Sequence, residues 1–416
     1  MSSCNPFQTR LVHQPRVLRL QQCCDSTDHT AWWDDNCLGS AWCCVSTYLH
    51  HRYVVLKRDV NCFFLTCRIH LPTTNCRYTA RVQRVEAPTF ALKPHTMQAV
   101  VINSTGGPEV LQLVQDHPVP QRGPGQVLVR VLSSSVNPVD TQLRAGTLPE
   151  AVGGPNALDG KYPKILGGDL AGTVEEADEG SQFKKGDAVA ALTPYFWHDT
   201  QHGTYAQYAV VDEPHLARVP AGVDLATAGG VPLVALTAWQ ALQGGKPQAG
   251  QRVLVLAASG GVGHVAVQLG KALGLAVAAV AGPSNVGWVK EVLGADEVVD
   301  YTKQDFAEVH RQQPFDIAID CLPDALDKCL SVLKPTGHYA HIQNLGTDPA
   351  VMQRLRQQHE AGRGPSVSHI FVTPNGAQLA EVLQLMEDGK VKLEVAKVSR
   401  PWGRSWPTRH AGGRCT

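Results

Sequence analysis

The chain has 416 residues, a length more typical of two domains than of one. Its 37 lysines and arginines equal its 37 aspartates and glutamates, so no net positive field would recruit nucleic acid or an anionic membrane. No run of apolar residues approaches the roughly 18 that a membrane span needs, which excludes a transmembrane helix.

The first 96 residues differ in composition from the rest. They hold nine of the 12 cysteines, whereas residues 77–320 hold none. Met1 to Cys24 carries arginines but no acidic residue, like an organelle transit peptide, and lacks the apolar stretch of a secretory signal. A cysteine-rich metal module is one interpretation of residues 25–96, but no spacing matches a zinc site. We therefore expect 1–96 to be an extension, disordered or targeting, with Met97 as the natural start of an enzyme.

Residues 97–225 show short apolar runs separated by glycine and proline turns. This texture is typical of a compact antiparallel barrel. A helical stretch from Ala226 to Gln243 then leads into the next domain. The strands expected in the barrel are Ala99–Asn103, Val127–Leu132, Ala171–Glu175, Ala188–Leu192 and Tyr205–Val211.

Residues 226–375 alternate apolar strands with amphipathic helical segments, the rhythm of a doubly wound parallel sheet. The family resemblance described below implies that residues 376–416 return to the barrel, which it makes the catalytic domain, with an atypical tail from 399. The fold class predicted is thus α/β plus β. The expected strands of the sheet are Val253–Ala257, Ala276–Ala281, Glu297–Asp300, Phe315–Asp320 and His338–Ile342.

A glycine turn follows the first of these strands. The sequence "AASGGVGHVAVQLGKALG" (257–274) places it between a buried strand and a helix. Helix N-terminal N–H groups lack internal partners and carry partial positive charge, so a pyrophosphate could bind there. The spacing departs from the standard glycine motif, and a turn without a ligand is the alternative. The predicted pyrophosphate residues are Ser259, Gly260, Gly261, Val262 and Gly263.

The tip of the second strand indicates which dinucleotide binds. An NAD site usually has an acidic residue there, about 20 positions after the glycines. This chain reads Ala-Gly-Pro-Ser-Asn (281–285), with no carboxylate to repel a 2′-phosphate. Ser284 and Asn285 could donate to that phosphate, with Tyr301 and Lys303 as neighbours. The sequence therefore favours NADP(H).

Several motifs in order resemble one known family. They include "SSSVNPVDTQLRAG" (133–146), "YPKILGGDLAGTVEE" (162–176), "GTYAQYAV" (203–210) and "LGADEVVDY" (293–301). From Met97 to about Val398, the chain resembles the medium-chain dehydrogenase/reductase superfamily. It is most similar to the zinc-independent quinone oxidoreductase branch, which includes zeta-crystallin-like proteins, plant chloroplast envelope homologues and alkenal/enone reductases. The resemblance implies a GroES-like catalytic barrel, a Rossmann domain, Asn137 beside the nicotinamide ribose, and Thr237 near the carboxamide and phosphates.

The residues themselves argue against zinc. The zinc-dependent members of this superfamily place a cysteine where Asn137 stands, and a His-Glu pair where Gly168-Asp169 stands. His198 and His202 are the best remaining metal pair, but a polar loop is the favoured interpretation because no third ligand is nearby. Cys321 and Cys329 have no evident activating partner and are expected to be packed thiols.

The sequence does not identify the catalytic proton donor. Tyr162, Tyr195 and Tyr205 are candidates, yet each could be a barrel aromatic, and water could act instead. Asn137 could equally serve a turn, and Thr237 could bond its own helix. The last 18 residues, from Ser399, have no periodicity, so the family's closing segment is expected to be absent or replaced.

Two functions remain open. The first is a metal-free, NADPH-dependent oxidoreductase that transfers hydride to quinones or α,β-unsaturated carbonyls. The second is a nucleotide-binding protein without turnover, structural or associated with RNA or a membrane surface. Balanced charge argues against nucleic acid. A membrane-peripheral protein and a homodimer are both compatible with the sequence, and the expected location is the chloroplast, with the cytoplasm as the alternative.

Overall fold

The structure, a computed structural model, describes residues 96–148, 154, 157–194, 202–342 and 350–398. It also gives the backbone of Pro349 and of short strands between residues 7 and 66. The chain divides into two units, Met1–Lys93 and Pro94–Thr416. Tyr195, His198 and the tail after Val398 lie outside the described residues.

The first unit contains short antiparallel strands. One sheet pairs β1 with β2, and the other has the order β3-β4-β5-β6. The role of residues 1–96 as an extension stays a prediction. The strands are β1 (Phe7–Arg10), β2 (Val17–Leu20), β3 (Thr30–Ala31), β4 (Cys44–Thr47), β5 (Tyr53–Arg58) and β6 (Asn61–Thr66).

The second unit begins with two antiparallel sheets. Their orders are β10-β7-β8 and β13-β9-β11-β12-β14, and a bridge between Ala99 and Ala206 joins β7 to the chain just before β13. Alternate residues of β9, β11 and β12 point inward and form an apolar core. The elements are β7 (Thr96–Ile102), η2 (Pro108–Val110), β8 (Gln112–Pro118), β9 (Gln126–Ser133), α1 (Pro138–Ala145), β10 (Lys164–Ile165), β11 (Asp169–Glu176), β12 (Ala188–Leu192), β13 (Tyr208–Asp212), η4 (Glu213–His215) and β14 (Leu216–Arg218).

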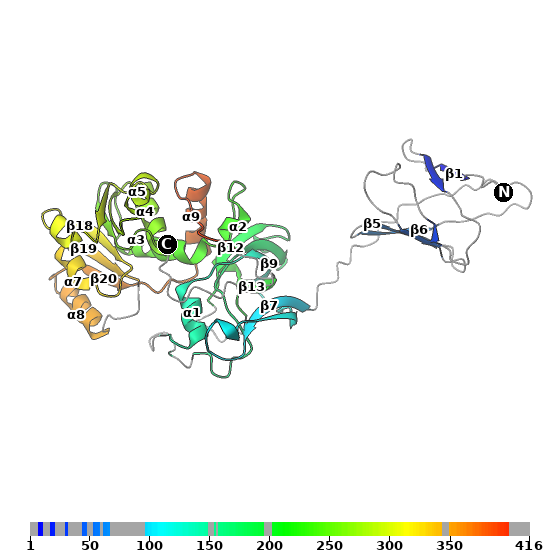
Figure 1. Cartoon of the computed structure of the whole chain (residues 1–416), viewed down its shortest axis with the longest axis horizontal. Helices are drawn as coiled ribbons and strands as arrows, with labels where there is room; N and C mark the ends of the chain where they lie inside the picture. Colours follow the sequence, from blue (N-terminus) through cyan, green and yellow to red (C-terminus); the bar gives the residue numbers. More distant parts are fainter. Residues whose placement is uncertain are drawn as a thin grey trace, which may run out of the picture. The chain divides into compact units, whose positions relative to one another are not determined.

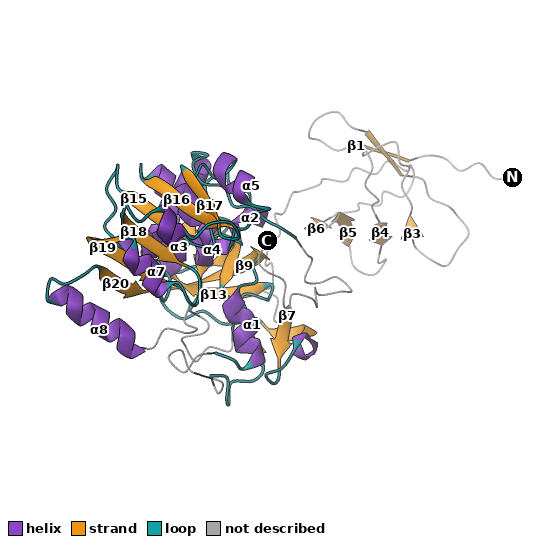
Figure 2. Cartoon of the chain, turned by 60° about the vertical axis from the view of Figure 1, so that its left-hand side comes forward, coloured by secondary structure: helices purple, strands orange, loops and turns teal. Residues whose placement is uncertain are grey.

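A six-stranded parallel sheet follows, with the order β17-β16-β15-β18-β19-β20. In chain order this is 3-2-1-4-5-6, the Rossmann arrangement. Helices lie against the strands, and α8 lies beside β20 (Figures 1 and 2). The elements are α2 (Leu225–Ala228), α3 (Pro232–Gly244), β15 (Arg252–Val255), α4 (Gly261–Ala272), β16 (Ala276–Ala281), α5 (Val286–Glu291), β17 (Glu297–Asp300), α6 (Phe306–Val309), β18 (Phe315–Asp320), α7 (Leu326–Ser331), β19 (Leu333–His341), α8 (Pro349–Glu360), β20 (Ser366–His369) and α9 (Gly376–Glu387).

The helical stretch expected over Ala226–Gln243 forms two helices, α2 and α3, which are separated by residues 229–231. A Cβ on Gly229 would lie 2.2 Å from the Ser133 hydroxyl and 2.6 Å from its carbonyl carbon. Glycine at position 229 therefore permits the close approach of this connection to the barrel backbone.

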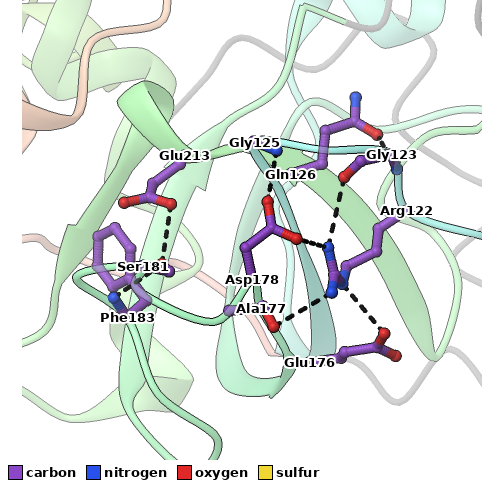
Figure 3. Close-up of polar contacts among 10 residues, drawn as sticks. All are labelled: Arg122, Gly123, Gly125, Gln126, Glu176, Ala177, Asp178, Ser181, Phe183 and Glu213. Carbon is purple, nitrogen blue, oxygen red and sulfur yellow. Dashed lines mark hydrogen bonds and ion pairs between the residues drawn. The ribbon is translucent and has the colours of Figure 1, made fainter.

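Arg122 bonds two segments of the barrel together, the turn before β9 and the end of β11 (Figure 3). Arg122 pairs with Asp178, lies 3.1 Å from a Glu176 carboxylate oxygen and donates to the Ala177 carbonyl at 3.2 Å. Asp178 also accepts the Gly125 N–H at 2.7 Å. These bonds hold the turn before β9 against the end of β11, and they lower the pKa of Asp178.

Candidate active site

The glycine turn connects β15 to α4 in a tight bend. Ala257 has a φ of +48°, a conformation that few side chains adopt. A Cβ on Gly263 would lie 2.2 Å from the Ala257 carbonyl oxygen, so only glycine permits this approach of helix to strand. Gly261 and Val262 begin α4, whose first N–H groups have no carbonyl one turn earlier. The bend thus leaves donors facing outward at a helix N-terminus.

This bend lies where the sheet order reverses. β15 is flanked by β16 on one side and β18 on the other. Ligands of open α/β sheets bind outside the carboxyl ends of the strands at such a switch point. The glycine turn therefore occupies the position that a dinucleotide pyrophosphate requires.

The tip of β16 lies against the glycine turn. The Asn285 side-chain amide donates to the Ser259 hydroxyl at 3.2 Å, which joins two predicted cofactor residues. Ser284 is exposed beside them. The Tyr301 ring lies 3.4 Å from where a Gly282 Cβ would be, and its side chain is 56% exposed. The structure thus brings Ser259, Ser284, Asn285 and Tyr301 to one region, where polar groups could hold a phosphorylated ribose.

A carboxylate not considered from the sequence stands on the neighbouring strand. Asp300 ends β17 and pairs in register with Ala281. It accepts two bonds from Thr302 and an ion pair from Lys303 at 3.0 Å, which lower its pKa. Its charge is thereby partly compensated within its own turn.

Thr237 is buried inside α3. Its hydroxyl donates to the Leu233 carbonyl at 2.7 Å, one turn earlier in the same helix. This is the alternative interpretation raised from the sequence, a hydroxyl bonded to its own backbone. Its role toward a cofactor stays a prediction.

Asn137 belongs to a buried polar network with Asp169. The Asn137 amide donates to Asp169 Oδ2 at 2.8 Å, and the Ser135 hydroxyl donates to the same oxygen. Asp169 Oδ1 accepts the Leu233 N–H at 2.7 Å, near the N-terminus of α3. Asp169 is fully buried, and burial raises its pKa to about 7. This carboxyl therefore connects the barrel to α3, the helix that precedes β15.

Of the tyrosine candidates, Tyr205 lies at this network. Its hydroxyl donates to the Ser135 carbonyl at 3.1 Å, and burial raises its pKa well above the usual value. A phenol held this way is a poor proton donor at neutral pH. Tyr162 is half-buried against the cluster around β7.

His264 in α4 was missed from the sequence. Its ring is buried, with Nδ1 2.9 Å from the Gly260 carbonyl, and Nε2 accepts the Glu394 N–H at 3.4 Å. Burial lowers its pKa. The sequence signal that could have revealed His264 is its position directly after the glycine motif. Its two ring contacts link the glycine turn to the C-terminal segment that contains Glu394.

The remaining metal and thiol candidates do not form a site among the described residues. The His202 ring lies 6.2 Å from that of His117, and no group of three metal-ligating side chains occurs in the ranges described above. Cys329 is buried, and burial raises the pKa of the Cys321 thiol to about 12, which agrees with packed thiols.

Comparison with known proteins identifies the family. Residues 123–221 match the alcohol dehydrogenase GroES-like domain, and residues 293–404 match the zinc-binding dehydrogenase family. A chloroplastic NADPH-dependent alkenal/one oxidoreductase of Arabidopsis thaliana is 32% identical, over 72% of this chain and 72% of that protein. The chain belongs to the medium-chain dehydrogenase/reductase family.

Two further relatives of this dehydrogenase/reductase extend the match. The mitochondrial NAD(P)H oxidoreductase RTN4IP1 of Homo sapiens is 30% identical, over 79% of this chain and 91% of that protein. The solved quinone oxidoreductase of Coxiella burnetii has a TM-score of 0.62 and 28% identity, with 72% of this chain and 90% of that chain covered. The expected fold, a Rossmann sheet with a GroES-like barrel, is confirmed, and the protein is an oxidoreductase that uses NADP(H).

Proposed function

We propose that this reductase transfers hydride from NADPH to quinones or α,β-unsaturated carbonyls. The structural observation that supports NADPH as the hydride donor is the bond between Asn285 and Ser259, which joins the glycine turn to a strand tip without a carboxylate. The names of the Arabidopsis and Coxiella relatives support the substrate classes. Both classes accept hydride at one end of a conjugated system that ends in oxygen.

Bound NADPH supplies the hydride, and the protein supplies geometry and charge. The N–H groups at the start of α4 would hold the pyrophosphate, and Gly260, Gly261 and Gly263 permit its close approach. Ser284, Asn285 and Tyr301 would hold the 2′-phosphate. Asn137 would contact the nicotinamide ribose from the barrel side.

We propose a metal-free reaction. Asp169 already accepts bonds from Leu233, Ser135 and Asn137, so both of its oxygens are engaged. The Asn137 NH₂ group is a donor and cannot replace a cysteine thiolate as a zinc ligand. The test is turnover after dialysis against a strong chelator, which should leave the rate unchanged.

The decisive assay follows NADPH oxidation with a quinone series and with an enal and enone series. We expect turnover with at least one series and a preference for NADPH over NADH. If NADPH binds and neither series supports turnover, the protein is instead the nucleotide-binding protein without turnover considered above.

We propose the chloroplast as the location, with the cytoplasm as the alternative. The printed location of the Arabidopsis relative supports the first, whereas the human relative is mitochondrial. No helix among the described residues is long and apolar enough to cross a bilayer. Fractionation of the natural protein, with its mass and N-terminus, would test the location and any peripheral attachment, and sedimentation would test the homodimer.

A further inference from the structure

Two side chains of α4 hold the backbone of the C-terminal segment, residues 391–394. The Gln268 side chain donates to the Lys392 carbonyl at 2.9 Å and accepts the Lys392 N–H at 2.8 Å. His264, one turn earlier in α4, accepts the Glu394 N–H at Nε2, at a longer distance of 3.4 Å. Side chains of a helix thus satisfy backbone groups that a neighbouring strand would satisfy in a sheet.

The bond to Glu394 determines which nitrogen of the His264 ring carries the proton. Because Nε2 accepts an N–H, it is unprotonated, and a neutral imidazole then has its proton on Nδ1. Nδ1 lies 2.9 Å from the Gly260 carbonyl oxygen and therefore donates to it. The same oxygen accepts the backbone N–H of His264 at 3.0 Å. The ring is buried, and burial lowers its pKa, which favours the neutral imidazole.

The Gly260 carbonyl orients the peptide that begins α4. In a trans peptide the C=O and the following N–H point in opposite directions. Two bonds that hold the Gly260 carbonyl toward the helix therefore direct the Gly261 N–H out of the helix N-terminus. Gly261 is exposed, and its N–H is among those that the proposed function assigns to the cofactor pyrophosphate. Since glycine has no side chain to restrict this peptide, its orientation depends on such bonds.

Packing fixes the C-terminal segment in the fold. Val391 is buried in the apolar core that includes residues of α3 and α4, and Leu393 packs against the same core. A Cβ on Gly230 would lie 2.9 Å from Leu393 Cδ2, so the segment also lies against the connection between α2 and α3. The segment is therefore held by apolar contacts as well as by the two polar side chains of α4.

We propose that the C-terminal segment is a positioning element of the cofactor site, and that it acts on the glycine turn through His264 and Gln268. Packing and Gln268 hold the segment, the Glu394 N–H orients the His264 ring, and the ring orients the peptide after Gly260. The contacts end at the glycine turn, so the effect is on NADPH affinity. This inference deepens the proposed function and rests on its placement of the pyrophosphate at the glycine turn.

Gln240 provides a matched control for Gln268. It lies on α3 and holds the backbone of Thr373 in the same way: its amide donates to the Thr373 carbonyl at 2.8 Å and its oxygen accepts the Thr373 N–H at 3.0 Å. Loss of either glutamine removes two bonds to a backbone segment. Only Gln268 belongs to the helix that begins at the glycine turn.

The first experiment measures the dissociation constant of NADPH by fluorescence titration of the full chain. Gln268→Met should raise it by about fivefold, and His264→Leu by about tenfold, the range expected for the loss of one or two hydrogen bonds. Gln240→Met should leave it as in wild type, although both glutamine variants lose similar unfolding free energy. The double variant of His264 and Gln268 should bind as weakly as His264→Leu alone, because both residues act through one segment.

A second pair of variants changes the segment and leaves α4 intact. Glu394 is exposed, and Glu394→Pro removes the N–H that His264 accepts. It should raise the dissociation constant of NADPH by about fivefold. Ala396→Pro, two residues later in the same exposed stretch, removes an N–H that neither His264 nor Gln268 accepts, and should bind NADPH as wild type does.

Turnover separates positioning from catalysis. With menadione as acceptor, KM for NADPH should rise in His264→Leu, Gln268→Met and Glu394→Pro, while kcat at saturating NADPH stays as in wild type. Wild-type affinity in these three variants, or an equal loss of affinity in Gln240→Met, would overturn the inference. Failure of the wild type to bind NADPH or to turn over any acceptor would instead refute the proposed function.

Discussion

At the scale of single residues, the glycine turn depends on one close contact. The Gly263→Ala variant would bring a Cβ within 2.2 Å of the Ala257 carbonyl and 2.8 Å of the Ala258 Cα. We expect it to lose at least about 2 kcal/mol of unfolding free energy and most NADPH affinity, because backbone on both sides must move. Denaturant unfolding and fluorescence titration would measure both.

Gly287→Ala is the control for that variant. A Cβ at Gly287 in α5 would meet nothing within 4 Å, so alanine should be neutral or stabilise the helix by up to about 1 kcal/mol. Equal losses in the two variants would contradict the role assigned to Gly263.

Asp169 makes stability depend on pH. Its pKa is about 7 in the folded protein against an unfolded value near 3.9, so its neutral form stabilises the fold below about pH 4. That contribution, at most about 4 kcal/mol, is lost as the pH rises toward 7. Through this group, the unfolding free energy of wild type should be higher at pH 5 than at pH 8. In Asp169→Asn, which has no titrating carboxyl at this position, the difference between the two unfolding free energies should be smaller. An unchanged difference would show that the carboxyl is ionised at both pH values.

At the scale of elements, the tip of β16 should decide between NADPH and NADH. Ser284→Asp would place a carboxylate beside Asn285 and Ser259, where it repels a 2′-phosphate and can hold a ribose hydroxyl. We expect the ratio of kcat/KM for NADPH over NADH to fall by about tenfold or more. Ser104→Asp, on an exposed barrel residue, should leave the ratio unchanged.

The contacts of Arg122 with the two loops should contribute to the unfolding free energy but not to NADPH binding. Arg122→Gln removes bonds to Asp178, Glu176 and Ala177 and should cost about 1 to 3 kcal/mol of unfolding free energy. Arg311→Gln breaks only an exposed pair with Glu308 and should cost less than about 1 kcal/mol. A change in KM for NADPH on Arg122→Gln would contradict this separation.

At the scale of the whole molecule, the unit that begins at Pro94 contains both the barrel and the dinucleotide sheet. Its cores are built from its own residues, including β7 at its start. We expect the chain without residues 1–93 to fold and to keep the kcat and KM of the full chain. A loss of NADPH binding on this truncation would show that the first unit takes part in the site.

The local pattern of apolar residues was enough to predict several strands of this unit with the correct bounds. Ala188–Leu192, Ala276–Ala281, Glu297–Asp300 and Phe315–Asp320 form strands with the predicted bounds. Strands with weak apolar character were missed: β8 is exposed or half-buried throughout, and β20 reads Ser-Val-Ser-His. Such strands form because a neighbour offers hydrogen bonds, which no pattern within the segment reveals.

The alternation of strands and helices, the glycine turn and the absence of a carboxylate at the tip of β16 can all be predicted from the amino-acid sequence, because each depends on residues close together in the chain. Contacts between groups that are distant in the chain depend on how the chain folds. Asp169 touches Asn137 and Leu233, and His341 stands between Asp320 and His369, because sheet register and domain packing bring them together. Burial then raises the pKa of Asp169 and of Asp320 and lowers that of His369, and burial is a property of the folded chain.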